Sequence, residues 1–160
     1  MAQALAVTTN AGEITMERTF AAPRALVFEA FTTAEHLKNW WGPLSYTMPV
    51  CEVDFRPGGT WLYCFRGPNG EEAWAKSVYK EIVAPERIVF TSSLTDAEGN
   101  PIPGLPVSVD TIELTEANGQ TKLVHRAAYD TTADREQMEA MMMVEGLTES
   151  WNRLESYLGK

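Results

Sequence analysis

The chain has 160 residues, 44% of them hydrophobic and 22% charged, a composition typical of one globular domain with its own core. Its formal net charge of −9 disfavours nucleic acid or an anionic membrane surface as a partner. No apolar run is long enough to span a membrane and no basic signal-like start is present, so we expect a cytoplasmic protein. Cys51 and Cys64 lack a metal-binding spacing, which predicts free thiols and no metal site.

The first quarter of the chain predicts a strand and two short helices behind a lead-in. We expect residues 1–12 to be flexible and residues 13–160 to form the single domain. Apolar and polar side chains alternate from Glu13 to Phe20, the pattern of a half-buried strand. Thr33 is placed to cap the second helix, which Gly42-Pro43 would end.

After the helices, turn signals separate a series of strands. The expected strands cover residues 51–55, 60–66, 72–83, 87–94, 107–115 and 120–129. A turn centred on Asn118-Gly119 pairs Ile112 with His125 and brings Asp110 within side-chain reach of that histidine. Strands in series followed by a helix predict an α+β fold with the helix across one face of an antiparallel sheet.

The last stretch predicts one long helix over residues 131–158, with Thr131 as its cap. Six apolar residues recur at the spacing of a single helical face: Ala140, Val144, Leu147, Trp151, Leu154 and Leu158. Gly146 interrupts the helix, and we expect it to mark a close approach of backbone or ligand. A cluster of methionines from Met138 to Met143 indicates an adaptable surface on the first half of the helix.

Strand alternation predicts which side chains face that helix. A three-residue loop with a bulge at Gly70 pairs Tyr63 with Ala75 and turns Trp74 outward. A four-residue loop would instead turn Trp74 inward, and the sequence leaves that choice open. The predicted inner face combines aromatic, small and a few polar residues: Tyr63, Ala75, Ser77, Tyr79, Asp110, His125 and Ala127. Small residues opposite large aromatics predict a hollow suited to an apolar ligand.

Several motifs recur here in the order of a known family: Ala22-Pro23, Trp40-Trp41-Gly42-Pro43, Arg56-Pro57-Gly58-Gly59-Thr60-Trp61, Pro68-Asn69-Gly70, Pro85-Glu86-Arg87-Ile88 and the closing helix with Gly146 and Leu154. From about residue 13 to 158 the chain resembles the heat-shock-protein-90 ATPase activator homologue family, within the START-like (SRPBCC), birch-pollen-allergen-like superfamily. The resemblance implies a helix-grip fold, in which a curved antiparallel sheet with two short helices near the N-terminus wraps around a long C-terminal helix. Leu147, where an aromatic is common in the family, and Ser77, where a glycine is common, alter the implied cavity.

The resemblance and the inner face together give a candidate site. The candidate ligand-binding residues are Phe31, Trp40, Trp41, Trp61, Tyr63, Ser77, Tyr79, Phe90, His125, Met143 and Leu147. Asp110 and His125 are weak catalytic candidates, since an aspartate could orient the imidazole as a general base. A satisfied buried polar pair explains the same two residues without catalysis.

Three function classes remain open. The first is a small binding protein that holds a lipid-like, polyketide-like or aromatic molecule between sheet and helix, and this is the function we expect. The second is a polyketide cyclase- or hydrolase-like enzyme that uses Asp110 and His125, and the third a co-chaperone-like module with a protein partner. A homodimer is compatible with all three, and nothing in the sequence calls for a cofactor.

Overall fold

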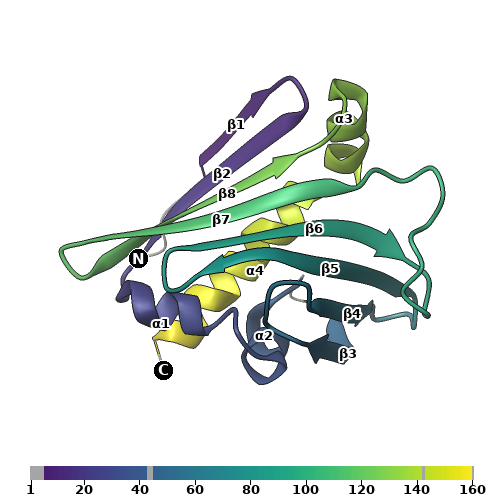
Figure 1. The fold of residues 1–160 in the computed structure, drawn as a ribbon. Coiled ribbons are helices and arrows are strands. Elements are labelled where there is room, and N and C mark those ends of the chain that lie inside the picture. The colour runs from purple at the N-terminus through teal and green to yellow at the C-terminus, as the bar shows by residue number, and fades with distance from the viewer. Residues whose placement is uncertain (1–5, 43–44, 142, 160) are drawn as a thin grey trace.

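The computed structural model describes residues 6–42, 45–141 and 143–159 (Figure 1). Eight antiparallel strands form one sheet in the order β1-β2-β8-β7-β6-β5-β4-β3. The strands are β1 (Ala6–Asn10), β2 (Glu13–Phe20), β3 (Thr47–Val53), β4 (Thr60–Arg66), β5 (Glu72–Val83), β6 (Arg87–Thr95), β7 (Ser108–Ala117) and β8 (Gln120–Ala128). The helices are α1 (Arg24–Glu29), α2 (Ala34–Trp40), α3 (Thr132–Ala140) and α4 (Met143–Leu158). No helix in the described part of the chain is long and apolar enough to cross a membrane.

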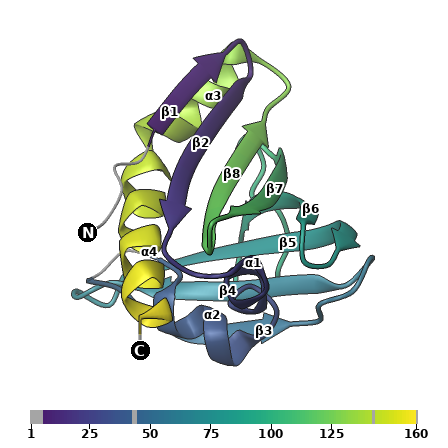
Figure 2. The ribbon, with the colours of Figure 1, turned by 90° about the vertical axis from the view of Figure 1, so that its left-hand side faces the viewer.

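The sheet is strongly curved. Figure 2 shows β1, β2 and β8 rising steeply while β4 and β5 run across them, with α4 along one side. Along β2 the buried side chains are Ile14, Met16, Arg18 and Phe20, which is the predicted alternation. The predicted antiparallel sheet is therefore confirmed, and its concave face is the one that the apolar side of α4 covers.

Both predicted hairpin registers are confirmed. Tyr63 pairs with Ala75, because the Gly67 N–H donates to the Glu71 carbonyl and so closes a three-residue loop, in which Gly70 has φ +86°. This register places Trp74 opposite Cys64, on the sheet face away from Tyr63, and so settles its orientation. In the other hairpin Ile112 pairs with His125, around a turn in which Asn118 and Gly119 both have positive φ.

The lead-in expected over residues 1–12 is a strand between Ala6 and Asn10. This strand pairs with β2 at the edge of the sheet. All five of its side chains are exposed, so its sequence carries no alternation of apolar and polar residues. The strand is joined to the sheet by main-chain hydrogen bonds to β2. A pattern of buried and exposed residues could therefore not predict it. Residues 1–5 lie outside the described part of the chain.

The prediction of a single long helix over residues 131–158 is wrong. The segment forms α3 and α4, with Met141 at the end of α3 in a non-helical conformation. None of the described side chains of α3 is buried, whereas Leu147, Ser150, Trp151 and Leu154 of α4 are. A regular apolar spacing is satisfied by two helices joined at a bend as well as by one, so the pattern could not locate the break.

Polar contacts fix α4 to the rest of the molecule, including several from Arg153 to the carbonyl groups of Asn39, Trp41 and Gly42. The buried Arg18 of β2 donates to Asn152 Oδ1 at 2.7 Å and to Glu155 Oε2 at 3.0 Å. The backbone N–H of Gly42 donates to Ser150 Oγ at 2.7 Å. The helix is therefore anchored to β2 and to the end of α2, and its Leu147 end lies over the middle of the sheet.

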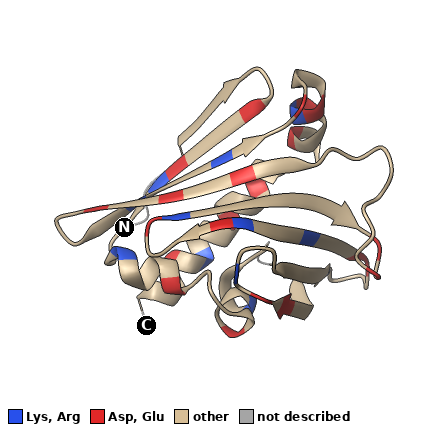
Figure 3. Cartoon of the chain, in the orientation of Figure 1, with Lys and Arg blue, Asp and Glu red and all other residues tan. Residues whose placement is uncertain are grey.

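Figure 3 shows residues of both charge signs distributed over the strands, with acidic positions along β7 and basic positions on the neighbouring β8. Lys122 lies 2.9 Å from Glu17 on the neighbouring strand, and Arg87 lies 3.3 Å from Glu81. These pairs are half exposed and belong to the solvent side of the sheet. The outer face is thus a mixed charged surface, while the inner face carries the candidate site.

Candidate functional site

A cavity of about 150 Å³ lies between the concave face of the sheet and the helices. Met143 and Leu147 of α4 and Met138 of α3 line one side, and Trp41 closes another. From the sheet the cavity is lined by Tyr63, Ala75, Ser77, Phe90, Ser92, Ser93, Leu94, Ser108, Asp110, His125 and, just after β8, Tyr129, with Pro106 from the preceding loop. The space suits about one aromatic ring.

A row of hydroxyl groups crosses the floor of this cavity. Ser77 pairs with Ser92, and Ser92 pairs with Ser108, so the three serines lie in register on β5, β6 and β7. Ser77 Oγ and Ser92 Oγ are 3.4 Å apart. Paired residues of antiparallel strands point to the same face, so the row lies on the concave side beside the apolar wall.

The row ends in a buried pair of ionisable side chains. His125 Nε2 lies 2.6 Å from Asp110 Oδ2, and Ser108 Oγ donates to the other carboxylate oxygen, Oδ1. The three residues are 2–6% exposed. Each carboxylate oxygen of Asp110 therefore has a hydrogen-bond partner. Such partners are what allow a carboxylate to be buried in an apolar environment.

Two phenols complete the polar inventory of the cavity. Burial raises the pKa of Tyr63 and the pKa of Tyr129 far above the usual range, so both phenols keep their proton at neutral pH. The Tyr129 hydroxyl contacts Met143 Sδ at 3.5 Å. Among the described residues, the cavity is therefore lined by hydroxyl groups, one imidazole, the indole of Trp41 and the carboxylate of Asp110, whose two oxygens are already engaged.

The structure brings seven of the eleven candidate residues together in this cavity: Trp41, Tyr63, Ser77, Phe90, His125, Met143 and Leu147. Phe31, Trp61 and Tyr79 instead line a neighbouring void of about 10 Å³, together with Trp41 and Phe90. That void is too small for a ligand and has the size of a packing defect. Trp40 lines neither space, because its indole N–H donates to the Ala30 carbonyl at 3.0 Å within the core.

The sequence-based prediction missed Ser92, Ser93, Leu94, Pro106 and Ser108, which also line the cavity. Ser92 and Leu94 follow Phe90 at intervals of two on β6, and Ser108 precedes Asp110 by two on β7. Continuing the alternation from the assigned residues would have found all three. Pro106 belongs to a loop, where no periodicity applies.

The close approach of backbone expected at Gly146 is wrong, and the alternative of a ligand contact there stays a prediction. A Cβ built at this glycine meets no atom within 4 Å in the described part of the chain. The glycine belongs to the regular helix α4, and the backbone contact that does occur nearby uses Ser150 instead. Residues on one helical turn share similar surroundings, so the sequence could not tell which of them touches the neighbouring segment.

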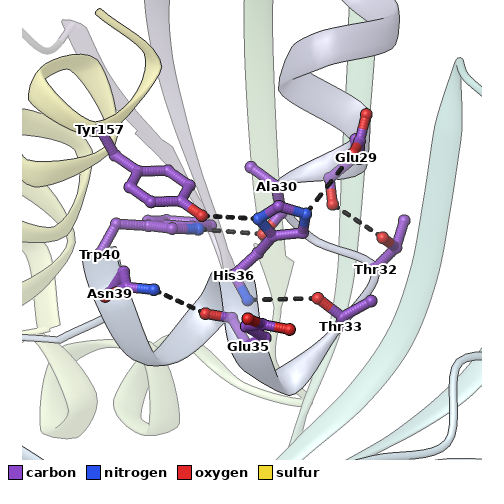
Figure 4. Close-up of polar contacts among 9 residues, drawn as sticks. All are labelled: Glu29, Ala30, Thr32, Thr33, Glu35, His36, Asn39, Trp40 and Tyr157. Carbon is purple, nitrogen blue, oxygen red and sulfur yellow. Dashed lines mark hydrogen bonds and ion pairs between the residues drawn. The ribbon is translucent and has the colours of Figure 1, made fainter. Parts of the chain in front are cut away.

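The chain's other histidine lies at a second, surface pocket of about 280 Å³ formed by α1, α2 and the end of α4. Figure 4 shows His36 between Glu29 and Tyr157: its Nδ1 is 2.7 Å from the Tyr157 hydroxyl and its Nε2 is 3.5 Å from Glu29 Oε1. Glu29 is 62% exposed, so this contact is open to solvent. The His36 side chain is 30% exposed, so its ring is partly covered.

The curved antiparallel sheet, the helix across its concave face and the cavity between them define a protein of the START-like superfamily. The family model for Activator of Hsp90 ATPase homolog 1-like protein matches residues 21–159, and the chain belongs to this family, as the resemblance implied. No curated protein matches the chain.

Solved structures of bacterial proteins share the fold over nearly the whole chain. Protein Ms6760 from Mycobacterium smegmatis is 26% identical, with a TM-score of 0.89 over 99% of this chain and 97% of that one. Protein NE0264 from Nitrosomonas europaea is 28% identical, with a TM-score of 0.81 over 92% and 94% of the two chains. A protein from Arthrobacter aurescens, 24% identical, has a TM-score of 0.89 over 96% and 91% and supports the fold alone.

Proposed function

We propose that this protein binds a small, largely apolar molecule in the cavity between the sheet and α4. The observation that carries the proposal is the composition of the cavity wall. Aromatic and aliphatic side chains from five elements converge on a space of about 150 Å³, and a row of serines that ends at Asp110 and His125 supplies polar groups on one wall. Apolar walls with a few convergent polar groups are typical of ligand pockets.

The size of the cavity limits the ligand. A dry cavity of about 150 Å³ accommodates a molecule of the size of benzene. Met138 and Met143 border this space, and their unbranched side chains can rearrange around a larger ligand. A single-ring aromatic molecule or a short aliphatic chain is therefore the ligand class that fits best.

Native mass spectrometry of protein purified gently from its own cells, followed by organic extraction, tests the proposal. We expect a retained apolar molecule, and we expect its loss in Leu147→Trp, which fills the cavity from α4. Ser156→Trp is the matched control, because it adds the same indole to an exposed position of the same helix. Protein that is empty and shows no melting shift with any member of a panel of lipids, polyketides and aromatics would contradict the proposal.

The contact between His125 and Asp110 supports a second candidate, a cyclase- or hydrolase-like activity. A carboxylate 2.6 Å from Nε2 would orient the imidazole as a general base at the cavity wall. In that case His125→Ala abolishes turnover of bound esters or polyketides while the protein stays folded. Turnover that persists in this variant would rule the pair out as the catalytic group.

The family description suggests a third candidate, a partnership with a chaperone ATPase. Such a role would act through the surface and not through the cavity. Pull-down of the chaperone that survives Leu147→Trp but is lost on reversal of surface charges would favour it over ligand binding.

A further inference from the structure

One ring nitrogen of His125 is buried and has no hydrogen-bond partner. His125 is 2% exposed, and its Nδ1 contacts no donor or acceptor among the residues that the structure describes. The ring lines the cavity, with Phe90 on one side and Trp151 on another, both at 6.2 Å between ring centroids. A buried polar atom without a partner is rare in folded proteins, so this nitrogen is a point at which a ligand can gain a hydrogen bond.

Asp110 determines what that nitrogen can do. An ionised carboxylate only accepts hydrogen bonds, so His125 Nε2 must carry the proton that lies on the 2.6 Å contact with Asp110 Oδ2. In the neutral imidazole Nδ1 is then left with a lone pair and acts as an acceptor. Ser108 donates to the second oxygen of Asp110, which holds the carboxylate in place for this role.

We propose that the ligand is an uncharged single-ring or similarly small molecule with a hydroxyl group that donates to His125 Nδ1. This inference rests on the proposed function and names the chemistry of the ligand. An apolar body fits between Phe90, Leu147 and Met143, and the hydroxyl gives the buried Nδ1 of His125 a hydrogen-bond partner. A carboxylate ligand would set its own acceptors against Nδ1 and its charge against Asp110, which disfavours it.

The inference is tested by titrating the wild-type protein with phenol, toluene and benzoate. Protein NMR follows the binding of each compound. Phenol and toluene have nearly the same shape and differ in the donor. We expect phenol to bind about tenfold more tightly than toluene, the effect of one hydrogen bond to a buried acceptor. Benzoate should bind more weakly than both.

Nitrogen-15 NMR of the imidazole rings gives a readout that needs no substitution at His125. We expect the His125 ring to carry its proton on Nε2, with the Nδ1 resonance moving when phenol is added and staying in place when toluene is added. The chain has two histidines, so His36→Phe assigns the resonances. This variant also serves as the matched control, since His36 lies at the surface pocket, outside the cavity.

His125→Phe keeps a ring at the site and removes the acceptor. We expect it to abolish the preference for phenol over toluene, while His36→Phe retains it. If toluene binds to the wild type as tightly as phenol, if benzoate binds most tightly, or if the Nδ1 resonance is that of a protonated nitrogen, the inference is wrong and the apolar binding site stands. If neither phenol nor toluene binds, the proposed function fails and the inference fails with it.

Discussion

At the scale of single residues, Arg18 is the most buried basic group in contact with α4. Its side chain is 1% exposed, and its guanidinium donates to Asn152 and Glu155 from the middle of β2. A buried charge is stable only while its partners remain, so the partners matter more here than at a surface pair. The guanidinium also joins β2 to the last turns of α4, the helix that closes the cavity.

We expect Glu155→Gln to lower the free energy of unfolding by about 1–2 kcal/mol, because it removes the charge that compensates Arg18 and leaves an amide. Asp54→Asn is the matched control: its partner, Arg56, is 67% exposed, and the loss should stay below about 0.5 kcal/mol. Urea unfolding of the two variants checks the difference. Equal losses would mean that the burial of Arg18 has no energetic consequence.

Gly146 allows a second test at this scale, since it sits in a helix with free space around it. Gly146→Ala should raise the free energy of unfolding by about 0.5–1 kcal/mol, through the higher helix propensity of alanine. Gly119 also has open space around its Cβ position, but its φ is +77° in the β7–β8 turn. Gly119→Ala should therefore destabilise by about 1 kcal/mol. Thermal melts of both variants are the measurement. Opposite changes in stability would show that the backbone conformation of the glycine, and not the space around its Cβ position, decides whether alanine stabilises or destabilises the protein.

At the scale of elements, two helices begin with the same cap and differ in what they bury. Thr33 Oγ1 accepts from His36 N at 3.2 Å at the start of α2, and Thr131 Oγ1 accepts from Asp134 N at 3.0 Å at the start of α3. Helix α2 buries Leu37 and Trp40, whereas α3 buries none of its described side chains. The same local interaction is therefore linked to the core in one helix and not in the other.

Thr33→Ala should lower the global free energy of unfolding by about 1 kcal/mol, the usual worth of such a cap. Thr131→Ala should leave the global value almost unchanged and instead speed hydrogen exchange of the α3 amides, because α3 can open without exposing the core. Hydrogen exchange followed residue by residue, together with urea unfolding, separates the two outcomes. A global loss of the same size in both variants would show that α3 unfolds only with the whole molecule.

Elements with a strong local signal could be predicted, and those defined by long-range contacts could not. The β7–β8 hairpin followed from Asn118-Gly119 and strand alternation, and with it the meeting of Asp110 and His125. Strand β1 is fully exposed, and the break between α3 and α4 leaves the apolar spacing intact, so neither had a signal in the sequence.

At the scale of the whole molecule, the cavity depends on the curvature of the sheet and on how deeply α4 sits in it. Alternation along each strand predicts which side chains face inward, but not how far the two layers stand apart. Of the predicted residues, Tyr63 lines the cavity while Tyr79, one strand further, lines only the small void. That difference is set by the position of the helix over the sheet, which no single stretch of sequence encodes.

The buried phenols predict alkaline unfolding of the whole molecule. Burial raises the pKa of Tyr63, Tyr79 and Tyr129 above the value of about 10 that each has in the unfolded chain. Below about pH 10 both states are protonated and stability is unaffected, whereas above it only the unfolded state loses protons, so stability falls as pH rises. For Tyr63, which is 9% exposed, the slope should reach about 1.4 kcal/mol per pH unit. Urea unfolding between pH 9 and 11.5, with tyrosinate absorbance as the probe, should show this decline, and Tyr63→Phe should make it shallower. A decline of equal slope in wild type and variant would show that Tyr63 ionises in the folded protein as readily as in the unfolded chain.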